Sequence, residues 1–339
     1  MKSLNNDYYN PLFSHIYVEK DVLDHPRTQE ILRHFPNAVV IEIIHYKDVF
    51  CRRGQQYLLQ HNSQNLIIAQ KEDNFLYEGA PVCQSFGNSW FYYTSCMMNC
   101  VYNCEYCYLK GMYPSGNMVA FVNLEDTFTE VENRLKEHEL YICVSYDTDL
   151  LAVENIFGYT AEWAEFVKKH DNLKIEVRTK SANKRFFEEH EPSSGMITAF
   201  TLSPQYVIDA YEHKTPTLKA RLSCIKLAID KGFQVRLAFD PMIYCKDWRK
   251  QYSDMLKEVF ESIDMQRVID VSVGSFRISQ DYLKNMRRSE PYSAVVQFPY
   301  ENEKGVYQYP KRIMQEMEHF LVGELSRAIP AEKIFLWKE

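Results

Sequence analysis

Four of the nine cysteines fall within twelve residues, and three of them have the spacing of an iron–sulfur site. Cys100, Cys104 and Cys107 follow the pattern Cys-x3-Cys-x2-Cys. Three thiolates on one loop can bind three irons of a [4Fe-4S] cube and leave the fourth iron open. An open iron can chelate the amine and carboxylate of a ligand and pass it an electron. A cluster held by four thiolates lacks that position.

Structural zinc is the alternative reading of these cysteines, because zinc also binds Cys-x2-Cys pairs. Zinc needs a fourth ligand, which Cys96 could supply, but no second Cys-x2-Cys pair follows in the sequence. The spacing and the position of the segment favour iron–sulfur. Cys96 is then expected to be a small buried residue. Disulfides are not expected in a long chain with an odd number of cysteines.

The cysteine-rich segment begins where the first of six strand-like runs ends. These short runs are Trp90–Ser95, Leu140–Ser145, Leu173–Arg178, Ile197–Leu202, Phe233–Phe239 and Val268–Gly274. Amphipathic segments with helical spacing lie between them, at Asn123–His138, Thr160–His170, Thr217–Lys231 and Trp248–Ile263. The alternation predicts parallel βα units in a curved or barrel-like sheet. Sites in such sheets lie beyond the carboxyl ends of the strands, so the cysteines are placed for chemistry.

The pattern divides the chain into three regions. Residues 1–88 are expected to form a small mixed α/β region, with apolar runs at Ala38–Ile44 and Leu66–Ala69. The barrel region follows at 89–290. The last region, 291–339, begins with two apolar runs that flank a polar turn at Gly305, which predicts a hairpin. Tyr309–Ile329 predicts a final helix.

Composition excludes several classes of protein. The 339 residues are 46% hydrophobic and 25% charged, which is typical of a globular protein rather than a disordered or coiled-coil one. The net charge of −7 argues against a protein that coats nucleic acid or an anionic membrane. The sequence has no run long and apolar enough for a spanning helix and no apolar core of a secretion signal near its start. We therefore expect a cytoplasmic monomer without a membrane partner.

The cysteine motif, with Tyr106 before its last cysteine, resembles the radical S-adenosylmethionine (SAM) superfamily. The extension Cys104–Leu109 resembles the spore photoproduct lyase family in particular. Further matching segments are Phe121–Asp126, Val177–Lys180, Tyr206–Ile208, Ala220–Leu222 and Pro241–Trp248. The resemblance implies an α/β fold, a partial (β/α)6 TIM-type barrel of the radical SAM kind, with an N-terminal α/β extension and a C-terminal hairpin plus helix.

The resemblance also implies an activity. Such enzymes carry a [4Fe-4S] cluster that cleaves SAM reductively to methionine and a 5'-deoxyadenosyl radical, which abstracts hydrogen from the substrate. In this family the substrate is a cross-linked thymine pair in DNA. The expected partners are damaged DNA and an external one-electron reductant such as flavodoxin or ferredoxin.

The resemblance also implies candidate SAM-binding residues, which lie at the ends of three predicted strands. Thr148 and Asp149 come after the second strand, and Lys180 ends the third, where the family places a lysine near the SAM carboxylate. Thr201 and Ser203 close the fourth strand. The alternatives are a turn cap for Asp149, a solvated charge for Lys180 and an ordinary strand residue for Thr201.

Two tyrosines flank the last cysteine, as in the lyases. The resemblance places Tyr108 in a hydrogen-relay chain, whereas aromatic packing is favoured for Tyr106. The family carries a hydrogen-donor cysteine in a Cys-Thr-Ser-Asp-like sequence after the second strand, but Tyr146 stands at that place in this chain. Tyr146 is one candidate donor, and Cys143, three residues upstream, is the other. This departure leaves the photoproduct reaction open, but not the cofactor chemistry.

A second departure lies in the DNA-binding end. The stretch Val295–Pro310 keeps the family's aromatic residues but has a single lysine, Lys304. Phosphate contacts need cations, and candidates elsewhere are Arg178, Lys184, Arg185, Lys214, Lys219, Arg249, Lys250, Arg287 and Arg288. Three functions therefore stay open: repair of a thymine photoproduct, radical SAM chemistry on a non-DNA substrate, and a non-catalytic zinc or iron–sulfur protein.

Overall fold

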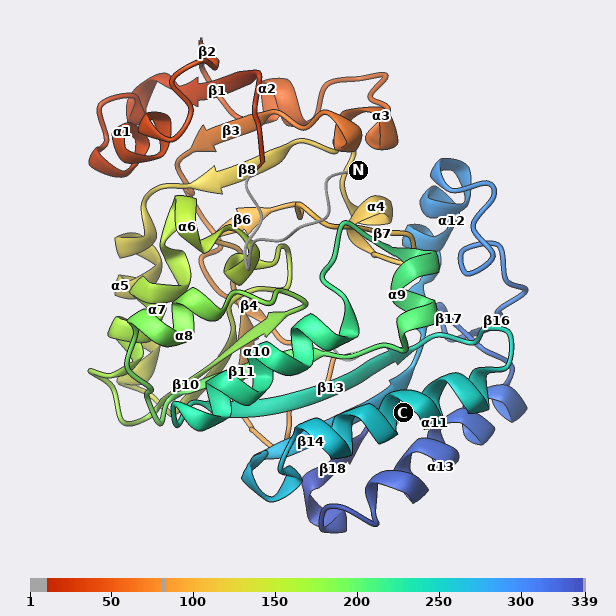
Figure 1. The fold of residues 1–339 in the computed structure, drawn as a ribbon. Coiled ribbons are helices and arrows are strands. Elements are labelled where there is room, and N and C mark those ends of the chain that lie inside the picture. Colours follow the sequence, from red (N-terminus) through yellow and green to blue (C-terminus); the bar gives the residue numbers. More distant parts are fainter. Residues whose placement is uncertain (1–10, 81–82, 338–339) are drawn as a thin grey trace.

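The N-terminal part of the chain forms a five-stranded sheet. The computed structural model describes residues 11–80 and 83–337. The strand order is β2 (Val39–Ile43), β1 (His15–Glu19), β3 (Leu66–Ala69), β8 (Met118–Phe121) and β6 (Met97–Met98). Only β6 runs antiparallel to its neighbour. Strands β6 and β8 come from beyond residue 88, so this sheet takes in chain from both sides of the predicted boundary (Figure 1).

The second sheet has eight strands and curls into a half-barrel (Figure 1). Its order is β18 (Ile334–Leu336), β14 (Asp270–Ser275), β13 (Gln234–Met242), β11 (Met196–Thr201), β10 (Leu173–Thr179), β9 (Leu140–Cys143), β5 (Phe91–Tyr93) and β4 (Tyr77–Glu78). Each of the six predicted strand-like runs overlaps one of these strands, and the six strands lie side by side and parallel. The sheet also takes in β18, which is parallel, and β4, which is antiparallel.

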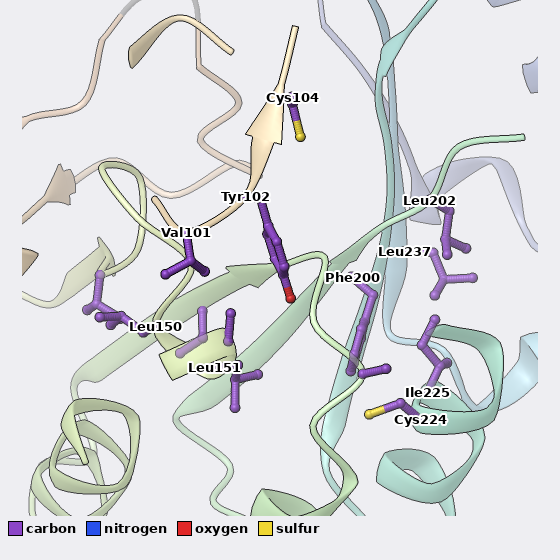
Figure 2. Packing of buried hydrophobic residues seen from close by; sticks show 14 of the residues in the cluster. Val101, Tyr102, Cys104, Leu150, Leu151, Phe200, Leu202, Cys224, Ile225 and Leu237 are labelled. Carbon is purple, nitrogen blue, oxygen red and sulfur yellow. The ribbon is translucent and has the colours of Figure 1, made fainter. Parts of the chain in front are cut away.

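Helices lie between consecutive strands of the half-barrel, as the amphipathic spacing predicts. The four expected ones are α5 (Leu124–Leu135), α7 (Tyr159–Val167), α10 (Leu218–Asp230) and α11 (Trp248–Ser262). Thr217 caps α10 by accepting a hydrogen bond from the backbone N–H of Ala220, and Gly232, at φ 87°, takes the left-handed conformation just after it. The apolar face of α10 packs on the sheet, where Figure 2 shows Ile225 beside Leu237.

Shorter elements complete the fold. The helices are α1 (Pro26–Arg33), α2 (Lys47–Phe50), α3 (Tyr57–Asn62), α4 (Leu109–Met112), α6 (Glu154–Phe157), α8 (Lys184–Glu189), α9 (Gln205–Tyr211), α12 (Gln280–Ser289) and α13 (Lys311–Leu325). The strands are β7 (Asn103–Cys104), β12 (Glu212–His213), β15 (Arg277–Ser279), β16 (Glu301–Glu303) and β17 (Val306–Gln308). Strands β16 and β17 pair antiparallel around Gly305. No helix within residues 11–80 and 83–337 is long and apolar enough to cross a membrane.

The interior of the half-barrel holds a buried charge network below the strand ends. The Arg236 guanidinium donates to Glu176 at 2.5 Å and to Asp270 at 2.7 Å, and the Tyr141 hydroxyl donates to Glu176 at 2.5 Å. Buried charges are tolerated when they are paired and hydrogen-bonded in this way. Tyr141, Arg236 and Asp270 stand near the starts of β9, β13 and β14, so the network lies toward the amino ends of these strands.

Candidate functional site

Asn99 fixes the start of the segment 99–108, which we call the cluster loop. It adopts the left-handed conformation, with φ 65°, which asparagine tolerates better than most residues. Its buried side chain donates to the carbonyl oxygens of Ser115 at 2.7 Å and Asn117 at 2.6 Å, and accepts from the Tyr57 hydroxyl at 3.0 Å. The loop is thereby held against α3 and the approach to β8.

Backbone contacts hold the rest of the cluster loop. The Cys100 carbonyl accepts hydrogen bonds from His61 at 3.0 Å and Gln64 at 3.1 Å. Cys104 lies in β7, which pairs antiparallel with β12 and aligns Cys104 with Glu212. Cys100 and Cys104 therefore stand on backbone that different neighbouring elements hold, and the Cys107 N–H donates to the Cys104 carbonyl oxygen at 3.2 Å within the loop.

The three motif cysteines line one cavity of about 390 Å³. Residues at the carboxyl ends of four parallel strands line it as well, namely Ser145, Arg178, Thr201 and Asp240. Ligand sites of parallel α/β sheets are found at this end of the strands. The motif cysteines therefore lie at the end of the sheet where the sequence argument placed them.

The three motif thiols could hold either a single metal ion or a cluster. Within the described residues, no three His, Cys, Asp or Glu side chains converge as ligands of one metal ion. A [4Fe-4S] cube offers a separate iron to each thiolate, so its cysteines lie around a cavity rather than meet at a point. The residues present fit such a cluster better than a single zinc ion.

Cys96 does not take part in this cavity. It is buried, and its sulfur accepts a hydrogen bond from the Trp163 indole N–H at 3.2 Å. The fourth ligand that the zinc alternative needs therefore points into the core, as expected for a small buried residue. All nine cysteines are free, in line with the odd count.

Burial governs the protonation of the motif thiols. It raises the pKa of Cys100 and Cys107 and raises the pKa of Cys104 to about 12. Lys180 works in the opposite direction at Cys104 and Cys107. Since metals bind the thiolate, loading this site would release protons and would be helped by the lysine.

Four of the five candidate SAM-binding residues line the cavity: Thr148, Asp149, Lys180 and Thr201. The hydroxyl of Thr148 is buried and has no hydrogen-bond partner. Because buried polar groups are nearly always paired, an unpaired hydroxyl at a cavity wall points to a ligand. Ser203 is not in the cavity wall, and its hydroxyl donates to Glu212 at 2.7 Å.

Asp149 performs the capping role that the sequence left as its alternative. One carboxylate oxygen accepts from the Ala152 N–H at 3.1 Å and from the Thr179 hydroxyl at 2.7 Å, and the other accepts from the Lys180 N–H at 2.7 Å. Burial raises the pKa of Asp149, and these bonds oppose that rise. Asp149 therefore joins the ends of β9 and β10 and sets the position of Lys180.

The side chain of Lys180 reaches the motif. Its ammonium lies 5.6 Å from the centre of the Tyr106 ring. Burial lowers its pKa, but Cys104 and Glu212 outweigh burial, so the pKa of Lys180 is raised overall. The lysine is thus a fixed positive charge beside the cysteines rather than a solvated one.

Tyr106 anchors the loop to a buried ion pair. Its hydroxyl donates to Glu212, which also pairs with Arg221 at 2.5 Å. Both members of the pair are fully buried. Burial opposes the Glu212 carboxylate, but Arg221 and Lys180 hold its pKa down, at about 2. The packing role predicted for Tyr106 agrees with this position, although its ring also lines the cavity.

Tyr108 and Tyr146 lie together in the cavity wall. The Tyr108 hydroxyl donates to the Tyr146 carbonyl oxygen at 2.6 Å. Cys143, the other candidate donor, is fully buried in β9, and its thiol lies 3.9 Å from the Glu176 carboxylate. It is not among the residues that line the cavity.

The cavity wall also holds residues that the sequence reasoning passed over, among them an ion pair and a further thiol. Asp240 and Arg277 form an ion pair at 3.0 Å in the cavity wall, and Cys83 lies on the same wall. A Cβ on Gly274 would come within 2.8 Å of the Arg277 guanidinium, so glycine there leaves room for the pair. Asp240 stands at the end of a predicted strand, where the strand-end rule could have found it. Cys83 precedes the barrel and belongs to no motif.

The aromatic residues of the predicted hairpin stretch pack on one another. The rings of Phe298 and Tyr300 lie 4.9 and 5.1 Å from that of Tyr309, and both tyrosines are buried. Of the candidate cations, several pair with nearby carboxylates: Arg178 with Glu176, Arg185 with Glu189, Arg249 with Glu316 and Lys250 with Asp254. These four cations are therefore partly neutralised by neighbouring carboxylates.

Comparisons with known proteins identify the family of this chain. The family model described as spore photoproduct lyase matches residues 11–335. A spore photoproduct lyase of Clostridium acetobutylicum is 22% identical over 339 residues, which is 93% of this chain and 96% of the relative. One from a Geobacillus species is 18% identical over 343 residues, 94% of this chain and 96% of the relative.

Solved structures show the same fold. A double mutant of spore photoproduct lyase with bound AdoMet and dinucleoside spore photoproduct has a TM-score of 0.81 at 17% identity, and covers 97% of this chain and 99% of its own. A complex of spore photoproduct lyase with the dinucleoside spore photoproduct has a TM-score of 0.81 at 16% identity, with 96% and 98% covered. With the family match over nearly its whole length, the chain belongs to the spore photoproduct lyase family and so to the radical SAM superfamily.

Proposed function

We propose that this chain is a radical SAM lyase that repairs a thymine photoproduct in DNA, with a [4Fe-4S] cluster on Cys100, Cys104 and Cys107. The observation that carries the proposal is that all three thiols of the motif line one cavity at the strand ends. The family membership supports it. When bound, the cluster would reduce SAM to methionine and a 5'-deoxyadenosyl radical, which takes hydrogen from the substrate.

The chain's own residues bind and shield the reactants. Lys180 supplies a buried positive charge for the carboxylate of SAM, and Asp149 fixes the backbone that carries it. The free hydroxyl of Thr148 can hydrogen-bond the ligand. Tyrosine rings line much of the cavity and exclude water from the radical, which would otherwise be lost to side reactions.

A second candidate substrate, other than DNA, is favoured by the charges of the hairpin. Strand β16 carries two exposed carboxylates, Glu301 and Glu303, against the single Lys304 of the turn. Phosphates are repelled by such a surface. A lyase acting on DNA should bind a photoproduct-containing oligonucleotide more tightly than the dinucleoside, and its affinity should fall as salt rises. Equal affinity for both would favour the non-DNA substrate.

The proposal is tested by anaerobic reconstitution followed by incubation with SAM, a reductant and dinucleoside spore photoproduct. We expect iron-dependent release of 5'-deoxyadenosine and conversion of the photoproduct to the unlinked thymine pair, both measured by chromatography and mass spectrometry. Cys224→Ala is a suitable control, because Cys224 is buried in α10, beside Ile225 in Figure 2, and does not line the cavity. Cleavage of SAM without repair would leave the radical SAM assignment and remove the proposed substrate.

A further inference from the structure

A second cavity lies at the carboxyl ends of the N-terminal sheet. Its volume is about 180 Å³, and its lining includes Tyr46 after β2, Lys71 after β3 and Phe121 at the end of β8. Strands β2 and β3 pair with opposite sides of β1, so the strand order changes direction at β1. Ligands of open α/β sheets bind outside the carboxyl ends of the strands at such a point. The topology therefore marks this cavity as a candidate binding site.

Glu19, at the end of β1, fixes the two loops that form much of the cavity. It is buried, and its carboxylate accepts hydrogen bonds from the backbone N–H groups of Tyr46 at 2.6 Å and Gln70 at 2.8 Å. The loops after β2 and β3 are thereby held in place by the protein itself. Small-molecule sites are usually preformed in this way.

Lys71 is a buried cation in the wall of this cavity. The residue is 7% exposed, and its ammonium group donates to the Ser95 carbonyl oxygen at 3.3 Å. Burial lowers the pKa of Lys71, and the neighbouring groups, Cys96 first and then Asp147, oppose this only in part. An ammonium group has three donor hydrogens, and a buried charge is costly unless an anion pairs with it. Lys71 therefore points to an anionic group on a ligand.

The charges around Lys71 restrict what that ligand can be. The charged side chains of the lining are the cations Lys47 and Lys71 and the carboxylates Glu72, Asp73 and Asp147. Glu72 and Asp73 are exposed at the rim, whereas Lys71 is buried. Three carboxylates against two lysines repel a phosphate dianion. A carboxylate that carries its own ammonium group has no net charge and can satisfy Lys71 without this repulsion.

The size and the remaining walls of the cavity suit a small apolar side chain. Met98, Met112 and Phe121 line it, together with tyrosine rings. Methionine and aromatic side chains adapt well to an apolar or thioether group. The cavity has less than half the volume of the cavity of the motif cysteines, and the two linings share Tyr93, Met112 and Asp147. A ligand here would therefore lie next to the site proposed for SAM.

We propose that the second cavity binds the zwitterion of an α-amino acid with an apolar side chain. Its carboxylate would pair with Lys71, its ammonium group would face the rim carboxylates Glu72 and Asp73, and its side chain would pack on Met98 and Met112. SAM cleavage in the neighbouring cavity would release such an amino acid, methionine. The choice of methionine as the ligand rests on the proposed lyase function, whereas the amino-acid site itself does not.

The first test is equilibrium dialysis of the reconstituted protein with labelled L-methionine. Saturating SAM is present, so that the cavity of the motif cysteines is filled, and the reductant is omitted, so that SAM is not cleaved. We expect one labelled methionine per chain. Lys71→Met should weaken this binding by at least about tenfold, because hydrogen bonds to charged groups contribute about 1.5–3 kcal/mol. The control Lys257→Met, on the exposed face of α11, should bind as the wild type does.

The second test follows thermal unfolding, which does not depend on SAM. L-Methionine should raise the unfolding midpoint of the wild type but not that of Lys71→Met. A variant with both rim carboxylates neutralised, Glu72→Gln with Asp73→Asn, changes only exposed side chains and should weaken methionine binding several-fold. This variant keeps the test decisive if Lys71→Met does not fold.

Three results would overturn the inference. They are loss of methionine binding when SAM is saturating, equal affinity in the wild type and in both variants, and displacement of methionine by inorganic phosphate. Each of them would leave the lyase function standing. Conversely, a protein that binds methionine through Lys71 but does not cleave SAM would keep the amino-acid site and remove the proposed function.

Discussion

The cavity of the motif cysteines has two walls that are built in different ways. The cluster loop is one continuous segment, pinned by Asn99 at its start and by β12 at its middle. The rest of the lining, which we call the strand-end wall, is assembled from separate segments and carries Tyr146, Arg178 and the Asp240–Arg277 ion pair. The difference separates two tasks: the loop fixes the ligands for a cofactor, and the strand ends determine what the radical meets.

The largest effect is expected when one cysteine is removed from the cluster loop, which tests whether this loop holds the cofactor. Cys104→Ala should reduce iron from about four per chain to background and lower SAM cleavage by more than about a thousandfold. Iron analysis and 5'-deoxyadenosine release measure this. Cys51 is exposed, so the control variant Cys51→Ala should keep the iron content and the SAM cleavage of the wild type. Full iron content in Cys104→Ala would show that the loop is not the cofactor wall.

The second largest effect is expected at Glu212, which anchors the cluster loop through Tyr106. Glu212→Gln leaves Arg221 buried without its partner, which should cost about 3–5 kcal/mol of unfolding free energy in urea. Because the folded pKa of Glu212 is about 2, its contribution is fully present above the ordinary carboxyl pKa and is lost as pH falls toward 2. The difference in unfolding free energy between the wild type and Glu212→Gln should therefore become smaller as the pH falls toward 2.

A surface carboxylate provides the control for that variant. Glu316 lies in the exposed ion pair with Arg312, where solvent screens the attraction, so Glu316→Gln should leave the free energy of unfolding nearly unchanged. Equal effects of the two variants would contradict the anchoring role of Glu212.

The junction of the two walls is tested by Lys180. Lys180→Met should weaken SAM binding by roughly 10–100-fold, because charge-assisted hydrogen bonds contribute about 1.5–3 kcal/mol, and should leave iron content unchanged. Equilibrium dialysis with the reconstituted protein measures it. Lys250→Met, on an exposed helix, should bind SAM normally. If Lys180→Met lost both iron and SAM binding, the lysine would be needed to hold the cluster on the loop rather than to bind SAM.

The smallest effect is expected at the unpaired hydroxyl. Thr148→Val should leave the fold as stable or stabilise it by about 1 kcal/mol, yet weaken SAM or substrate binding several-fold. Thr198 is the matched control, because its buried hydroxyl also lacks a partner but does not line the cavity. If Thr148→Val and Thr198→Val both leave binding intact, no ligand uses the Thr148 hydroxyl.

The cluster loop could be predicted from sequence, because the residues that define it are close together in the chain. The motif spacing, the strand before it and the amphipathic helices all lie within short windows, and the six strands appear where the runs predicted them. The same local rule placed Thr148 and Lys180 at strand ends. Ser203 also closes a strand, but its hydroxyl is bound by Glu212, a partner that no spacing rule indicates.

The residues of the strand-end wall could not be predicted from sequence, because this wall depends on contacts between distant segments. Cys83 and Tyr146 are far apart in the chain and meet only when β4 and β5 pair beside β9. Strand β18 joins the sheet from the far C-terminus, and β8 leaves the barrel region for the N-terminal sheet. The predicted division at residue 88 stays a prediction.

Electron paramagnetic resonance of the reduced, reconstituted protein, with and without SAM, tests the central claim most directly. The account predicts a reduced [4Fe-4S] signal, about four irons per chain, and a change of the signal when SAM binds the open iron. A colourless protein with one zinc, or a cluster signal that SAM does not alter, would contradict it.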